Sequence, residues 1–163
     1  MLFVGSYFFA NIEGITWFVK NVMPEIEGKL YIVGKGMEKL REELSRENVE
    51  VVGGVEDLAE YYYNANFIVA PIFSGSGMKV KTAEALMYGK TIFGTKEAFE
   101  GYELEFGKIG EECNSRDEFI EKINQYINDK KIEKFNKFSR NNYLEKYSNN
   151  ILKEGIKNLF KEL

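Results

Sequence analysis

Short apolar segments alternate with amphipathic segments along the first two-thirds of the chain. Most of the apolar segments are continuous, with few polar interruptions, which is typical of strands that are buried on both faces of a parallel sheet. We therefore expect strands at Leu2–Gly5, Lys29–Val33, Val49–Gly53, Phe67–Pro71 and Thr91–Thr95, with a weaker one at Lys108–Glu112.

Helical patterns separate these strands. Apolar residues recur every third or fourth position from Ile12 to Ile26, which predicts the first helix. We expect the second at Met37–Glu47, the third at Val55–Tyr63 with Glu56 and Asp57 in its first turn, the fourth from near Ser76, and the fifth after Ser115. Ser115 is a predicted N-cap because Glu118 follows three residues later.

Strand–helix alternation predicts an α/β fold, a Rossmann-like, doubly wound parallel sheet of about six strands in the order 3-2-1-4-5-6. The length fits a single domain covering residues 1–163. Residues 131–163 differ in character and predict a helical tail outside the sheet. Its apolar stripe consists of Leu152, Ile156, Leu159, Phe160 and Leu163.

Ligands of such sheets bind beyond the carboxyl ends of the strands. The loops expected there are Gly5–Asn11, Gly34–Gly36, Gly53–Val55, Ile72–Gly77 and Thr95–Tyr102, and most of them carry glycine at or just after the strand end. Glycine permits close approach of a ligand to the backbone, although it also serves tight turns that bind nothing.

Composition removes several classes of function. A net charge of −4 leaves no broad basic field for nucleic acid. Histidine is absent and Cys113 is the single cysteine, which excludes an intrachain disulfide and a thiolate metal cluster. No apolar stretch is long enough to cross a bilayer. We expect Cys113 to be a buried apolar side chain at a strand end, and a strand that starts at the first residues suggests a chain cut from something longer.

The segment 73–86, FSGSGMKVKTAEAL, has the features of a phosphate cradle. A helix that begins near Ser76 presents free N–H groups and its positive dipole end to an anion, and Gly75 and Gly77 leave room for it. Lys81 and Glu84 share one helix face, so the lysine can reach a phosphate and the glutamate a pair of sugar hydroxyls. The plainer interpretation is a surface ion pair between these two side chains.

Two better-known phosphate motifs do not fit this segment. A Walker A loop needs glycine where Val80 precedes Lys81 and Thr82. A dinucleotide fingerprint needs a third glycine, but Lys39 and Val80 occupy that position in the two candidate loops. The residues therefore favour a diphosphate at a helix N-terminus with a glutamate placed for a sugar hydroxyl.

The stretch SGSGMKVKTAEALMYGKTIFGTKEAFEGYE resembles the donor-binding region of family 4 (group 1) glycosyltransferases, which are retaining enzymes of GT-B fold. LFVGSYFFANIEGITWFV, LYIVGKG and VEVVGGVEDLAEYYYNANFIVAPI are similar to the earlier strands and loops of the same C-terminal, donor-binding domain. The resemblance covers nearly all of residues 2–130.

This resemblance implies the donor-binding half of a glycosyltransferase that transfers a sugar (a hexosyl type) from a UDP- or GDP-type nucleotide sugar, in bacterial polysaccharide or glycan biosynthesis. The acceptor-binding N-terminal domain is missing, so we expect this chain alone to be inactive. No metal and no cofactor are expected, and the location implied is cytoplasmic, free or peripheral to the inner membrane face. The catalytic residues stay unassigned, and the donor-binding residues implied are Gly5, Ser6, Gly53, Gly54, Val55, Gly75, Ser76, Gly77, Met78, Lys81, Glu84, Glu100 and Gly101.

The chain departs from the family pattern in two places. Many members carry two glutamates separated by seven residues. Glu84 matches the second of them, but Ser76 occupies the position of the first. Many also carry an arginine and a lysine in the first loop, whereas SYFFANIEG has neither, so Lys79 or Lys81 must offset the phosphate charge. These departures keep one alternative open, a non-catalytic nucleotide or nucleotide-sugar binding and assembly module. A further alternative is a domain whose glycine loops are purely structural.

Overall fold

A computed structural model of the chain describes all residues except 130–131, 152, 154–156 and 158–163. Its centre is a six-stranded sheet in the order β3-β2-β1-β4-β5-β6, with every pair of neighbouring strands parallel. The predicted fold class and strand order are confirmed. The strands are β1 Leu2–Val4, β2 Leu30–Val33, β3 Val49–Gly53, β4 Phe67–Ala70, β5 Thr91–Gly94 and β6 Gly110–Glu112.

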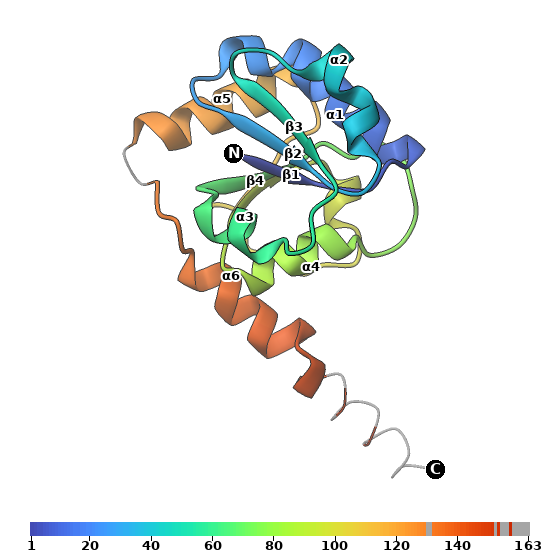
Figure 1. Cartoon of the computed structure of the whole chain (residues 1–163). Helices are drawn as coiled ribbons and strands as arrows, with labels where there is room; N and C mark the ends of the chain where they lie inside the picture. The colour runs from blue at the N-terminus through green and yellow to red at the C-terminus, as the bar shows by residue number, and fades with distance from the viewer. Residues whose placement is uncertain (130–131, 152, 154–156, 158–163) are drawn as a thin grey trace.

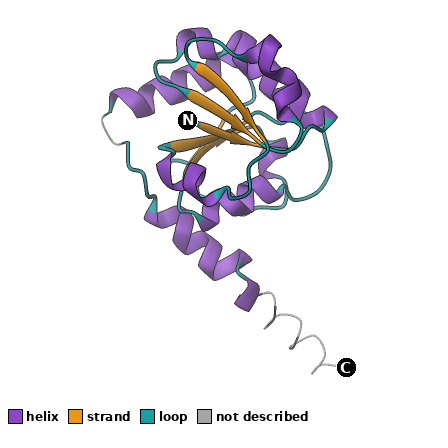
Figure 2. Ribbon diagram, viewed as in Figure 1, coloured by secondary structure: helices purple, strands orange, loops and turns teal. Residues whose placement is uncertain are grey.

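Helices cover both faces of this sheet (Figures 1 and 2). The α-helices are α1 Phe9–Asn21, α2 Arg41–Leu44, α3 Ala59–Asn64, α4 Val80–Met87, α5 Arg116–Asn128 and α6 Lys137–Asn142. Single 3-10 turns lie at Met23–Glu25, Met37–Leu40 and Glu97–Phe99, and a π-helical turn lies at Tyr143–Tyr147.

The core consists of the strand side chains and one face of each covering helix. Phe18 of α1 and Phe119 of α5 are both fully buried and their rings meet edge to face at 5.4 Å, so these two helices cover the same face. The opposite face is covered by α3 and α4, whose Tyr62 and Tyr88 rings stack at 4.5 Å. The predicted apolar spacing of the first helix places Ile15 and Val19 in the core. Burial of this kind supplies the main stabilisation of the domain.

The first three helices begin or end elsewhere than the sequence predicted. The first ends at Asn21, because Pro24 cannot continue it and a 3-10 turn takes over. The second region divides into a 3-10 turn and the short α2. The third begins at Ala59 rather than Val55, so Glu56 and Asp57 precede it. A carboxylate oxygen of Asp57 accepts the Ala59 N–H at 2.8 Å, which helps to start the helix there.

The fourth helix begins at Val80, not near Ser76. Gly75 and Gly77 have φ angles of 139° and 70°, which a right-handed helix cannot contain, so the chain stays non-helical up to Lys79. By contrast, the Ser115 cap is confirmed, because its hydroxyl accepts the Glu118 N–H at 3.3 Å. Cys113 is fully buried just after β6, as expected.

The described part of the tail packs beside α4 (Figure 1). Asn136 caps α6 by accepting the Ser139 N–H at 3.1 Å, and the Arg140 guanidinium donates to the Met87 carbonyl. The predicted apolar stripe from Leu152 to Leu163 lies outside the described residues. Among the helices that the structure describes, none has both the length and the apolar character needed to span a membrane.

Candidate functional site

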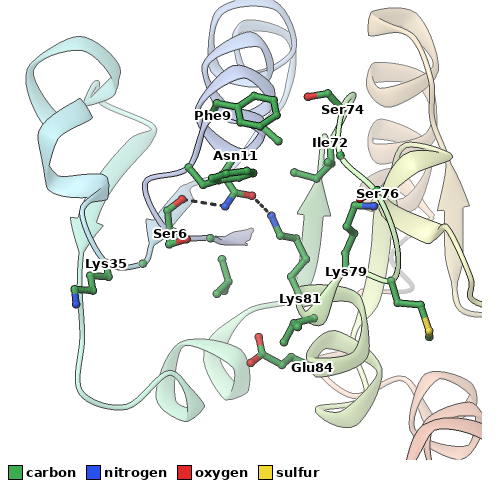
Figure 3. Close-up of a pocket in the computed structure, with 18 of the residues that line it drawn as sticks. Ser6, Phe9, Asn11, Lys35, Ile72, Ser74, Ser76, Lys79, Lys81 and Glu84 are labelled. Atoms are coloured by element: carbon green, nitrogen blue, oxygen red, sulfur yellow. Dashed lines mark hydrogen bonds between the residues drawn. The ribbon is translucent and has the colours of Figure 1, made fainter.

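A cavity of about 720 Å³ opens at the carboxyl ends of β1 and β4, where the strand order reverses (Figure 3). Its walls come from the loops after these two strands, the loops after β2 and β3, and the first turns of α1 and α4. The lining residues are Val4, Gly5, Ser6, Phe8, Phe9, Ala10, Asn11, Gly34, Lys35, Leu58, Ile72, Ser74, Gly75, Ser76, Met78, Lys79, Val80, Lys81 and Glu84. A volume of this size suits a drug-sized or nucleotide-sized ligand.

The non-helical segment from Gly75 to Lys79 is largely exposed beside this cavity. The backbone N–H groups of Gly75 to Lys81 donate no hydrogen bond to any protein acceptor among the described residues. The amides of Val80 and Lys81 open α4, so they also carry the positive end of its dipole. Such a run of exposed amides is suited to binding an anion.

Contacts on the outer side hold this segment in place. The Lys79 ammonium donates to the Gly77 carbonyl at 2.6 Å, to Glu97 at 2.7 Å and to Glu100 at 3.2 Å. The Tyr102 hydroxyl donates to the Lys79 carbonyl at 2.8 Å. The charge of Lys79 is therefore largely offset by carboxylates from the loop after β5, and its role here is to shape the segment.

Glu84, one turn into α4, faces the cavity (Figure 3). The fully buried Tyr62 donates its hydroxyl to Oε2 of Glu84 at 3.0 Å. Burial raises the pKa of Tyr62 far above its ordinary value, and the neighbouring Glu84 carboxylate adds to that rise, so Tyr62 stays a donor. This contact fixes one carboxylate oxygen of Glu84. The other oxygen is left at the cavity, where it can accept hydrogen bonds from the hydroxyl groups of a ligand.

Lys81 is the partly buried cation of the site. It extends from α4 toward Asn11, whose side-chain oxygen accepts from its ammonium at 2.5 Å, while the Asn11 amide donates to the Ser6 carbonyl at 2.9 Å (Figure 3). The ammonium lies 4.6 Å from the centre of the Phe3 ring. Desolvation lowers the pKa of Lys81 to about 7, and the charge of Lys79 acts in the same direction, against the opposing effect of Glu84.

Comparison with known proteins identifies the family. Residues 1–129 match the sequence model of the glycosyl transferases group 1. The chain belongs to this family. No curated protein matches it.

Solved structures of glycosyltransferases share the fold of this group 1 domain. Anabaena Alr3699/HepE, in complex with UDP and glucose, is similar with a TM-score of 0.76 at 13% identity, over 99% of this chain and 48% of that one. The pneumococcal O-GlcNAc transferase GtfA, in complex with UDP and GlcNAc, is similar with a TM-score of 0.70 at 19% identity, over 98% of this chain and 35% of that one. The chain thus spans about half the length of the first of these proteins and about a third of the second.

The site of this glycosyl transferase group 1 domain collects about half of the residues that the sequence suggested. Lining the cavity are Gly5, Ser6, Gly75, Ser76, Met78, Lys81 and Glu84. Outside the lining are Gly53, Gly54, Val55, Gly77, Glu100 and Gly101. The Lys81–Glu84 surface pair of the plainer interpretation is not among the ion pairs of the described residues.

The positions outside the lining have physical reasons. The glycines after β3 lie two strands away from β1, and Gly53 accepts the Gly34 N–H at 2.8 Å, so they support the loop that carries Lys35. Glu100 is paired with Lys79 on the outer side of the segment. Gly101 has a φ of 80°, and a Cβ added there would lie 2.6 Å from Cγ of Met78.

Sequence reasoning gave no role to several lining residues. Phe8 and Phe9 are 53% and 59% exposed at the rim of the cavity, and two adjacent aromatic residues in a loop after a strand could have indicated this. Asn11, in the first turn of α1, and Lys35, between two glycines in the loop after β2, also line the cavity. Among the residues that the structure describes, no group of three or more acidic or cysteine side chains is placed to hold a metal ion.

Proposed function

We propose that this chain is the nucleotide-sugar (donor) binding half of a glycosyltransferase. The observation that carries the proposal is the row of unoccupied amides from Gly75 to Lys81, which shares one cavity with Lys81 and Glu84. The diphosphate of the donor lies against these amides, and its ribose hydroxyls bind the free oxygen of Glu84. Gly5 and Ser6 form the facing wall.

Two relatives of known structure support a UDP-type donor. HepE was solved with UDP and glucose, and GtfA with UDP and GlcNAc. Because this chain covers less than half of either protein, we propose that a further domain supplies the acceptor site. In this proposal residues 1–163 form one donor-binding domain whose helical tail begins at residue 131, and the whole enzyme transfers a hexose with retention in bacterial glycan biosynthesis.

The chemistry proposed for this half is electrostatic. As the glycosidic bond breaks, negative charge grows on the departing nucleoside diphosphate. Preorganised amides and the ammonium of Lys81 stabilise that charge more in the transition state than in the bound donor. With these groups in place the proposed reaction needs neither a metal ion nor a cofactor.

Calorimetric titration of the chain with UDP and with GDP tests donor binding. We expect measurable affinity for at least one nucleotide and a loss of about tenfold or more in Glu84→Ala, as for a charged hydrogen-bond partner. Glu121→Ala on α5 is the matched control, since Glu121 is exposed on the opposite face of the sheet. Absence of binding to both nucleotides, or equal effects of the two substitutions, would overturn the proposal.

A non-catalytic binding module is the second candidate, because Ser76 stands where many family members place a carboxylate. We expect the 163-residue chain alone to transfer no measurable sugar, since in this proposal a further domain supplies the acceptor site. Chromatographic assay of sugar transfer by a protein carrying both halves separates the candidates. Transfer that depends on Glu84 supports the enzyme, and donor binding without transfer supports the module.

A further inference from the structure

The surroundings of Lys81 do not neutralise an ammonium group. On the α1 side the ammonium contacts only the amide oxygen of Asn11, and on the β1 side it lies over the ring of Phe3. The charged neighbours on its own segment are Lys79, which repels it, and Glu84, which attracts it. Tyr62 of α3 occupies one oxygen of that glutamate, and Lys35 contributes a further positive charge to the cavity.

The neighbouring charges of Lys79 and Glu84 act on Lys81 in opposite directions. Lys79 is itself paired with Glu97 and Glu100, so these two carboxylates are committed elsewhere. A neutral amide oxygen orients an ammonium group but does not replace its hydration as a carboxylate does. In the free protein Lys81 is therefore held in position without a counterion of its own.

Asn11 fixes where this side chain points. Its amide group is immobilised by the Ser6 carbonyl, and its carbon atoms fit closely over Gly5, where an added Cβ would lie 2.8 Å from Cγ of Asn11. Any larger residue at position 5 would displace Asn11. The three residues thus form one assembly that directs Lys81 to the wall of the cavity opposite α4.

We propose that Asn11 is a positioning residue for Lys81, and that Lys81 takes up a proton from solvent when the donor diphosphate binds. The step is a simple acid–base equilibrium: the neutral amine accepts one proton and the resulting ammonium pairs with a diphosphate oxygen. No other bond forms or breaks. This inference rests on the proposed function, and it adds a pH dependence to the same site.

The direction of the pH dependence follows from the lowered pKa of about 7 for Lys81 in the free chain. Above this pH the Lys81 amine is mostly neutral. Protonating it so that it can pair with the bound anion then costs part of the binding free energy. The affinity for UDP should therefore fall as pH rises, by up to about tenfold per pH unit above the free pKa. The terminal phosphate of UDP is mostly ionised above about pH 7, so it contributes little to the change in affinity above that value.

Calorimetry of UDP binding in buffers with different ionisation enthalpies tests the inference. At about pH 8 we expect uptake of roughly one proton per UDP, and much less near pH 6. Lys81→Arg is the decisive variant, because arginine is always charged and should bind UDP with no proton uptake. Lys35→Met should weaken binding yet keep the uptake, since Lys35 is an exposed lysine of the same cavity.

Asn11→Asp tests the positioning role. A carboxylate at this position supplies the missing counterion, so Lys81 is already charged in the free chain. The UDP affinity should then lose its pH dependence in the range from about pH 7 to about pH 8.5. Asn11→Ala should weaken UDP binding several-fold while proton uptake persists.

The outcomes separate this inference from the function on which it rests. UDP binding without proton uptake in the native chain, or native pH dependence in Lys81→Arg, overturns the inference and leaves the proposed function standing. Native pH dependence in Asn11→Asp overturns the positioning role. If neither UDP nor GDP binds at any pH, both proposals fail together.

Discussion

At the scale of single residues, the site is organised by polar contacts that reach beyond the cavity. Glu84 is directed by Tyr62, and Lys81 by Asn11. Neither partner stands next to its target in sequence: 22 residues separate the first pair and 70 the second. The sequence could single out Glu84 and Lys81 from their spacing on one helix, but it could not show which long-range partners hold them.

Tyr62→Phe tests the first of these contacts. The change removes a buried hydroxyl and leaves an oxygen of Glu84 without its donor, so we expect a loss of about 1 kcal/mol in the free energy of unfolding. UDP affinity should fall several-fold because the carboxylate is no longer fixed. Urea denaturation and calorimetry measure the two effects. Tyr61→Phe, at the half-buried neighbour, should change neither, and a similar loss there would contradict the assignment.

Lys81→Met tests the cost of the desolvated amine. The lysine pKa is about 7 when folded and 10.5 in the reference state, so between these values the unfolded chain binds more protons and stability rises with pH. Methionine removes this dependence and should raise the free energy of unfolding by about 1–2 kcal/mol at about pH 7. Denaturation near pH 7 and pH 9 checks this. A variant that is less stable than the native chain at both pH values contradicts it.

At the scale of elements, strands were easier to predict than helix starts. Continuous apolar runs mark β2, β4 and β5, whose residues are almost all buried, whereas Glu50 of the edge strand β3 is exposed. The Ser115 cap was also predictable, since its partner is three residues away. The start of α4 was not, because positive φ angles at two glycines and the distant carboxylates on Lys79 decide it.

Gly75→Ala tests the segment before α4. Alanine at a φ of 139° should strain the backbone by about 1–3 kcal/mol and turn the neighbouring amides away from the cavity. We expect UDP affinity to fall at least several-fold. Gly28→Ala is the matched control, because Gly28 also has a positive φ (108°), with nothing within 4 Å of an added Cβ, and does not line the cavity. It should lose comparable stability and keep its affinity, and equal losses of affinity would contradict this account.

At the scale of the whole molecule, the strand order places the cavity. The sheet runs outward from β1 in one direction and from β4 in the other, so the loops after these strands diverge and leave a space between them. The alternation of strands and helices predicted this edge of the sheet. The donor-binding role of Gly53, Gly54 and Val55 stays a prediction, because these residues lie outside the cavity lining while Leu58 of the same loop belongs to it.

Ligand binding should stabilise the whole domain. At a UDP concentration of about 100 times the dissociation constant, linkage predicts about 2.7 kcal/mol. For a domain of this size that corresponds to a rise of roughly 5–10 °C in melting temperature. Differential scanning calorimetry with and without UDP measures it. The absence of any shift with UDP or GDP would favour glycine loops that are purely structural.

The contact between Lys81 and Asn11 joins the two walls of the cavity, since one residue follows β1 and the other follows β4. A diphosphate that competes for the same ammonium weakens the tie between these walls. The Lys81 ammonium that the ligand binds therefore also sets the width of the cavity entrance. The empty and the ligand-bound forms of the domain should differ most in the distance between α1 and α4.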